Sequence, residues 1–150
     1  MKELFKNIIC YEVENEDHQL IAEALKVLKD NYDESVRYHT VGAALRCKTG
    51  NVYSGINCDG IHGSCAEFIA IGTAISKGER EFDVITATHL KAKNGLVAPC
   101  GNCRQMLFEY SPNIKVLLND EFGNIVKVSV RDLLPFAYEE IMEKHAPMDN

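Results

Sequence analysis

Cys65-Ala66-Glu67 and Pro99-Cys100-Gly101-Asn102-Cys103 are the two stretches that decide the fold, and Cys100 lies 33 positions after Glu67. Each stretch begins a predicted helix. Two cysteines with two residues between them are typical of a zinc site or of a redox pair. A redox pair requires neither a third cysteine nor a glutamate, whereas a catalytic zinc site has three protein ligands and an open fourth position. The sequence therefore predicts zinc binding by Cys65, Cys100 and Cys103, with Glu67 beside the open position.

The periodicity of the second helix supports this geometry. Cys103, Met106, Leu107 and Tyr110 follow the i, i+3, i+4, i+7 spacing of one helix face, which places Cys103 on the inward side. Cys100 lies just ahead of the same helix, so the sulfur atoms of Cys100 and Cys103 can both reach one ion. If the N-termini of the two helices converge, Cys65 supplies the third thiolate.

Helical and extended patterns alternate outward from the two motifs. The expected elements are a helix at 17–32, strands at 41–47 and 51–56 joined by a hairpin turn at 48–50, a buried helix at 64–77, a strand at 84–90, a helix at 102–110, a strand at 114–118, a turn at 120–124, a strand at 125–130 and a helical segment at 131–145 interrupted at Pro135. This alternation predicts a single α/β domain over residues 1–150, with a mixed sheet of about five strands and helices on both faces.

Composition narrows the classes of partner and compartment. The chain has 150 residues and a net charge of -6, which weighs against a nucleic-acid polymer as partner. The first residues do not resemble a signal peptide, and no apolar run approaches the roughly 18 residues of a membrane span. We therefore expect a cytoplasmic protein with no membrane partner. In a reducing compartment the six cysteines indicate metal binding or catalysis rather than disulfides.

The motifs are similar to those of the cytidine deaminase superfamily. Cys65-Ala66-Glu67 and Pro99-Cys100-x-x-Cys103 match its zinc signature. Further segments resemble the small homotetrameric cytidine deaminases and blasticidin-S deaminase, namely Val41-Gly42-Ala43-Ala44-Leu45, Gly55-x-Asn57, Cys103-Arg104-Gln105 and Leu133-Leu134-Pro135. The resemblance implies a three-layer α/β/α fold, a homotetramer, one Zn²⁺ per chain and a free nucleoside as the small-molecule substrate.

The implied reaction is hydrolytic removal of the exocyclic amine of cytosine. Zinc-bound hydroxide attacks C4 of the pyrimidine, and Glu67 shuttles the protons. Cytidine or deoxycytidine is the first choice of substrate, and blasticidin S or a related aminopyrimidine nucleoside is the alternative. Phe68 stands where many cytidine deaminases have an arginine, so the charge of the three thiolates must be compensated differently. Arg104 is expected to support a thiolate through a hydrogen bond.

The resemblance also implies residues that bind the substrate. Asn57 and Asp59 match an Asn-x-Glu motif that holds a sugar hydroxyl, although Asp59 is one carbon shorter than glutamate. His39 occupies the position of a pocket aromatic residue, and Ala66 lies within the zinc signature itself. Tyr138 matches a C-terminal tyrosine that closes the pocket.

Two structural alternatives stay open at this point. Ser64-x-x-Glu67 has the spacing of a helix capping box, in which Glu67 would only satisfy backbone amides. Cys58, or His62 in its place, could join the three cysteines in a closed structural zinc site of a non-catalytic module. Cys10 and Cys47 are expected to be ordinary buried cysteines.

Overall fold

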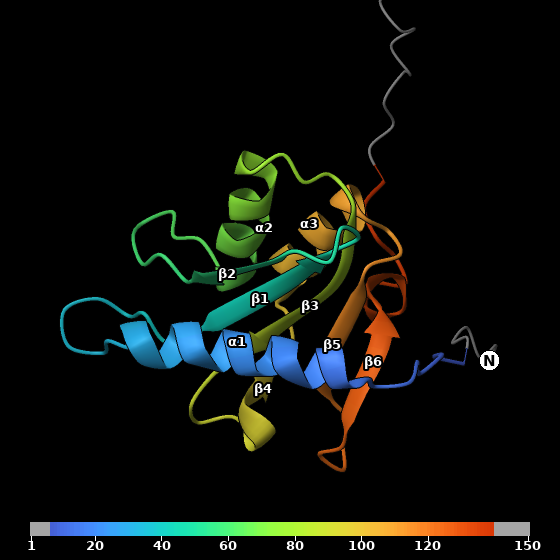
Figure 1. The fold of residues 1–150 in the computed structure, drawn as a ribbon, viewed down its shortest axis with the longest axis horizontal. Coiled ribbons are helices and arrows are strands. Elements are labelled where there is room, and N and C mark those ends of the chain that lie inside the picture. Colours follow the sequence, from blue (N-terminus) through green and yellow to red (C-terminus); the bar gives the residue numbers. More distant parts are fainter. Residues whose placement is uncertain (1–6, 140–150) are drawn as a thin grey trace, which may run out of the picture.

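Alternating apolar residues in the central strands build a sheet that is covered on both faces. The computed structural model describes residues 7–139 and shows three layers, with α1 on one face of the sheet and α2 and α3 on the other (Figure 1). The elements are α1 Asn15–Asn31, β1 Gly42–Cys47, β2 Val52–Ile56, α2 Ala66–Ser76, β3 Phe82–Thr88, η1 Lys93–Gly95, β4 Leu96–Val97, α3 Gly101–Tyr110, β5 Lys115–Asn119, β6 Ile125–Ser129 and η2 Val130–Leu133. The predicted fold class is confirmed.

The strand order of the mixed sheet is β2-β1-β3-β5-β6. β1 is antiparallel to both β2 and β3, β3 and β5 are parallel, and β6 returns antiparallel to β5. This accounts for the five strands expected from the sequence. The sheet also contains β4, which pairs with the end of β3. β4 has two residues, too few to show the alternation by which a strand is recognised in a sequence.

Successive strand residues face opposite layers and so form two cores. Ala44, Val84 and Leu117 pack toward α1, whereas their neighbours Leu45, Ile85 and Val116 pack toward α2 and α3. Two glycines allow the helices to lie close to the sheet. A Cβ atom on Gly42 would lie 2.5 Å from the carbonyl oxygen of Ala24 in α1, and one on Gly55 would lie 2.7 Å from the backbone nitrogen of Ala70 in α2. Only glycine permits this closeness without displacing a helix.

The helical segment expected at 131–145 is not confirmed. The chain forms the short η2 turn and then runs without helix to residue 139, while residues 140–145 lie outside the described range. Pro135 explains the difference because it has no amide proton to donate and disfavours a helical conformation of the residue before it. Leu134 accordingly has φ -143° and ψ 68°. Among residues 7–139, no helix is both long and apolar enough to cross a membrane.

A buried ion pair joins α1 to the far edge of the sheet. The side chain of Asp17 is fully buried, and its carboxylate lies 2.6 Å from Nζ of Lys127 and 3.0 Å from the guanidinium of Arg46. The backbone amide of Glu14 donates a further hydrogen bond of 2.9 Å to Asp17. Burial by itself opposes ionisation, but the hydrogen bonds from Glu14, Lys127 and Arg46 lower the pKa of Asp17 below its usual value.

We expect Asp17→Ala to lower the free energy of unfolding by about 3–5 kcal/mol, because it removes the 2.6 Å partner of the buried Lys127 ammonium, which then keeps only Glu14 at 4.0 Å. The folded-state pKa of Asp17 is lowered, so the ionised carboxylate stabilises the folded protein fully above the unfolded-state pKa of about 3.9. This stabilisation is lost as the pH falls through the folded-state pKa. Urea unfolding at pH 7 and at progressively lower pH tests both statements. Asp30→Ala, which removes the exposed Lys26–Asp30 pair of the same helix, is the control and should change the midpoint little. Equal effects of the two substitutions would contradict this account.

Candidate metal centre and active site

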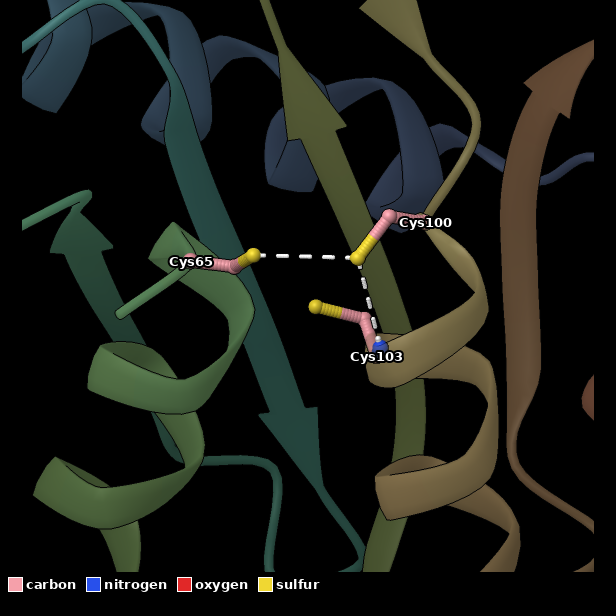
Figure 2. Close-up of side chains that lie close together, drawn as sticks. All are labelled: Cys65, Cys100 and Cys103. Atoms are coloured by element: carbon pink, nitrogen blue, oxygen red, sulfur yellow. Dashed lines mark hydrogen bonds between the residues drawn. The ribbon is translucent and has the colours of Figure 1, made fainter. Parts of the chain in front are cut away.

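Three cysteine sulfur atoms converge at the N-termini of α2 and α3, as Figure 2 shows. Cys65 is the N-cap residue of α2, Cys100 is the N-cap residue of α3, and Cys103 lies in the first turn of α3. The three sulfur atoms lie within 4.8 Å of one another, and those of Cys65 and Cys100 are 3.7 Å apart. The sequence placed these cysteines together correctly.

The cluster fits Zn²⁺. Tetrahedral zinc with Zn–S bonds of about 2.3 Å requires sulfur atoms about 3.8 Å apart, which matches the Cys65–Cys100 separation. Burial and the neighbouring negative groups raise the pKa of the Cys103 thiol. Burial also tends to raise the pKa of Cys100, but hydrogen bonds involving Cys103, Cys65 and the backbone of Asn102 lower it below its usual value. A bound cation would relieve the cost of gathering thiolates here, and the two helix N-termini offset part of their charge.

Glu67 lies in the same site and is 4% exposed. Burial raises the pKa of its carboxyl group above the usual range. A raised pKa moves a carboxyl group toward the pH at which it both accepts and releases protons readily. The capping box considered from the sequence does not form, because the N-cap residue is Cys65 rather than Ser64 and makes no side-chain cap hydrogen bond.

A cavity of about 550 Å³ adjoins the cysteines. This volume lies in the usual range for small-molecule sites. Apolar side chains and a few polar groups share its wall, and the residues other than cysteines are Val41, Asn57, Asp59, His62, Gly63, Ser64, Ala66, Glu67, Phe68, Val97, Ala98 and Asn102. The arrangement therefore offers one metal position and one buried carboxylate beside room for a small ring.

The closed site of four thiolates is not formed. Cys58 lines the cavity but does not belong to the metal-binding group, which in residues 7–139 consists of Cys65, Cys100 and Cys103. The backbone of Cys58 is instead paired with that of Ser64 through hydrogen bonds of 2.9 and 2.8 Å. Of the two remaining cysteines, Cys47 is buried as expected, whereas Cys10 is exposed, so the sequence interpretation of Cys10 was wrong.

Asn57, Asp59 and Ala66 line the cavity, but two other candidate substrate residues do not belong to its wall. Nδ1 of His39 lies 2.9 Å from the backbone carbonyl oxygen of Asn57, which directs the ring to the end of β2. The side chain of Tyr138 is 67% exposed, and its backbone amide and carbonyl are bound by the side chain of Gln105. Of the candidate substrate residues, Asn57, Asp59 and Ala66 therefore belong to the cavity wall, whereas His39 and Tyr138 do not.

Arg104 supports the loop before the metal ligands rather than a thiolate. Its guanidinium donates hydrogen bonds of 2.8 Å to the carbonyl of Pro99 and 3.1 Å to the carbonyl of Leu133. None of its hydrogen bonds within the described part of the chain reaches a cysteine sulfur. The sequence could not distinguish these acceptors, because Leu133 is 29 positions away.

Several cavity residues were not identified as site residues from the sequence. Val97 and Ala98 enter the wall because β4 pairs with β3 and directs the chain into Pro99. Asn102 also lines the cavity, as does His62, which the sequence offered only as a possible ligand of a closed zinc site. Only their positions in the sequence could have identified these residues as part of the site. Ala98 and Asn102 lie beside Pro99, Cys100 and Cys103, and His62 lies in the short loop before Cys65.

Comparison with known proteins agrees with this geometry. Residues 14–118 match the model of the cytidine and deoxycytidylate deaminase zinc-binding region. The chain is 33% identical to blasticidin-S deaminase of Bacillus cereus over 85% of this chain and 96% of the relative. It is 37% identical to cytidine deaminase of Halalkalibacterium halodurans over 79% of this chain and 91% of the relative.

A solved structure extends the comparison to the fold. The crystal structure of cytidine deaminase from Burkholderia pseudomallei superposes with a TM-score of 0.67 and 34% identity, over 81% of this chain and 98% of that one. The shared zinc-binding region, the sequence identity and the common fold agree with the cysteine cluster and the buried Glu67. The chain therefore belongs to the cytidine deaminase superfamily, whose members are zinc-dependent hydrolytic deaminases.

Proposed function

We propose that this protein hydrolyses a free cytosine nucleoside, cytidine or deoxycytidine, to the corresponding uridine and ammonia. The observation that carries the proposal is the meeting of three cysteines with a buried glutamate at one cavity of nucleoside size. Two cytidine deaminases among the relatives are 34–37% identical over about four-fifths of this chain. We further propose that each chain holds one zinc ion through Cys65, Cys100 and Cys103.

Zinc, when bound, lowers the pKa of a coordinated water and so supplies a nucleophile at neutral pH. Glu67 would accept one proton of that water and pass it to N3 of the pyrimidine, and it would then take the second proton from the new hydroxyl at C4 and pass it to the departing amine. One carboxylate can serve all these steps if it lies within hydrogen-bond reach of both water and ring. Val41 and Phe68 contribute apolar side chains to the same cavity wall, and the burial of Glu67 strengthens the electrostatic contribution of its carboxylate.

The charge of the cavity favours a nucleoside over a nucleotide. Asp59 and Glu67 contribute carboxylates to its wall, and the lining residues within 7–139 include neither lysine nor arginine. A substrate phosphate would therefore meet like charge without a compensating cation. Two unit charges about 5 Å apart at an effective dielectric constant of about 20 repel by about 3 kcal/mol.

We expect kcat/KM for cytidine monophosphate to be at least about 100-fold lower than for cytidine, as this repulsion requires. Steady-state kinetics with the two substrates at equal ionic strength measures the ratio. Asp59→Asn should bring the two values closer together, because it removes one of the charges. Equal efficiency on nucleoside and nucleotide would contradict the charge argument.

Deamination of blasticidin S is the second candidate, with less support. The blasticidin-S deaminase relative is matched over more of both chains than the cytidine deaminase of H. halodurans. In this structure one oxygen of Asp59 accepts a hydrogen bond of 3.3 Å from the amide of Tyr38. Its other oxygen has no hydrogen-bond partner within residues 7–139, so the carboxylate can bind either a sugar hydroxyl or a cationic tail of a substrate.

Asp59→Ala is expected to raise KM for the true substrate by about 10- to 150-fold and to leave kcat nearly unchanged, which is the effect of losing one charged hydrogen bond. Cytidine and blasticidin S should be assayed in parallel, and the substrate whose KM responds is the one that Asp59 binds. Unaltered kinetics on both would show that Asp59 has no role in substrate binding.

An ammonia-release screen tests the proposed function directly. The purified, zinc-loaded protein is assayed with cytosine, cytidine, deoxycytidine, blasticidin S and guanine. We expect ammonia from the two cytosine nucleosides and none from guanine. Release from blasticidin S alone would replace the first candidate by the second, and release from none would contradict both.

We also propose that the protein assembles as a homotetramer, which the partial exposure of apolar residues of α2 supports. The sequence predicts a buried helix, yet Phe68, Ile69 and Ile75 are only half-buried in the single chain. Sedimentation or light scattering measures the assembly. The cytoplasmic location expected from the sequence stays a prediction.

A further inference from the structure

The side chain of Asn57 binds three backbone groups where the β1–β2 hairpin ends. Its Oδ1 accepts hydrogen bonds from the backbone amides of Thr40 (2.8 Å) and Val41 (3.0 Å), and its Nδ2 donates a hydrogen bond of 2.6 Å to the carbonyl of Tyr38. The partners fix the orientation of the amide, because two of them are donors and one is an acceptor. Asn57 thus binds the whole segment from Tyr38 to Val41.

These contacts extend the sheet by one step beyond its last regular pair. Gly42 and Ile56 are paired in the β1–β2 register, and the backbone amide of Asn57 still donates a hydrogen bond of 3.0 Å to the carbonyl of Val41. The reciprocal bond from the amide of Val41 goes to the side-chain oxygen of Asn57 instead of its backbone oxygen. The backbone oxygen is turned toward Nδ1 of His39. The asparagine side chain therefore replaces a strand carbonyl at the position where the chain enters the cavity wall.

The segment held by Asn57 carries part of the cavity. Val41 and Asp59 both line it, and the amide of Tyr38 donates a hydrogen bond to the carboxylate of Asp59. Residues 38–41 and 57–59 thus form one unit, in which Asn57 sets the positions of an apolar wall residue and of a charged one. An amide has two acceptor sites and two donor hydrogens, so the three contacts of Asn57 leave one N–H for any ligand.

We propose that Asn57 is a positioning residue, which shapes the nucleoside cavity by holding residues 38–41 against 57–59, in addition to any contact that its remaining N–H makes with a substrate. This inference rests on the proposed function and adds a second role to the one that the sequence resemblance implies for Asn57. It also makes a distinct claim. Loss of the Asn57 side chain harms the binding of every substrate, whether or not that substrate carries sugar hydroxyls.

The discriminating experiment compares Asn57→Ala with the unaltered holoenzyme on cytidine and on dideoxycytidine, which lacks both ribose hydroxyls beyond the 5′ position. We expect KM to rise by about 10-fold or more on both substrates, with kcat changed less than KM. A residue that acted only through a sugar hydroxyl would lose nothing on dideoxycytidine. A rise confined to cytidine would therefore overturn the proposal.

A second readout does not depend on activity. Hydrogen exchange of the Thr40 and Val41 amides should accelerate in Asn57→Ala, because both lose their acceptor. Asn57→Asp keeps an acceptor for these two amides and loses the donor to Tyr38, so it should restore much of their protection and part of the KM. Asn31→Ala, at the exposed end of α1, is the matched control and should change neither.

The outcomes separate this inference from the proposed function. If the unaltered protein does not deaminate cytidine, the proposed function fails, and the exchange data still decide whether Asn57 holds residues 40 and 41. If Asn57→Ala does not fold, Asn57→Asp carries the test through its KM values on the two substrates. Unchanged exchange of Thr40 and Val41 in a folded Asn57→Ala protein would overturn the inference.

Discussion

Glu67→Gln is expected to lower kcat by about 10²–10⁴-fold, the usual contribution of a general acid–base group. The glutamine has the same shape as glutamate but can neither accept the proton of water nor deliver it to the pyrimidine. Because Glu67 is almost fully buried, bulk water cannot readily replace it as a proton carrier. The fold and the zinc content should be retained, since the capping box that would give Glu67 a structural role is absent.

The measurement combines steady-state kinetics with zinc analysis and circular dichroism of the same preparation. Glu109→Gln is the matched control, because Glu109 is exposed on α3 and does not line the cavity. It should be indistinguishable from the unaltered protein. Appreciable turnover by a folded Glu67→Gln protein would disprove the proton shuttle, and a variant that is unfolded or free of zinc would point to a structural role.

Replacing any one of Cys65, Cys100 and Cys103 by serine should abolish turnover and lower the affinity for zinc. Loss of a residue that only hydrogen-bonds to a metal ligand lowers metal affinity by roughly 10- to 100-fold, and loss of a ligand itself should lower it further. The reason is that the three sulfur atoms form the whole metal-binding group within residues 7–139. Metal analysis after dialysis and competition with a chromogenic chelator provide the affinity. Thermal unfolding should also occur at lower temperature, because zinc binds the folded state.

Cys58→Ser is the matched control for this series. Cys58 lies on the cavity wall like the ligands but outside the metal-binding group. Its substitution should leave one zinc per chain and a measurable turnover. If Cys58→Ser removed zinc as completely as Cys100→Ser, the site would be a closed one with four thiolates, and the open position on which hydrolysis depends would not exist.

The metal site could be predicted from the sequence because its signals are local. Cys100 and Cys103 are separated by less than one helical turn, and Cys65 and Glu67 occupy the start of another helix. Long elements with clear periodicity, such as α1 and β3, were also predicted to within about two residues of their bounds. Fold class follows from the alternation of these elements.

The missing parts depend on contacts that a single sequence does not display. The acceptor of Arg104 at Leu133 and the partners of Asn57 at residues 38–41 lie 16–29 positions away along the chain. Spacing and periodicity carry no information about such pairs. The segment expected to be helical on both sides of Pro135 forms only the short η2 turn before that residue within the described range, because proline cannot continue the helical hydrogen bonding. Tyr138 was assigned by resemblance, and its side chain points to solvent in the single chain.

The most direct test of the central claim is the fate of cytidine in water enriched in the heavy oxygen isotope. The zinc-loaded protein is incubated with cytidine, and the products are analysed by mass spectrometry and by an ammonia assay. We predict one ammonia for each uridine formed and one heavy oxygen atom at C4 of that uridine, because hydrolysis takes its oxygen from water. Absence of uridine, or uridine without the heavy isotope, would contradict the account.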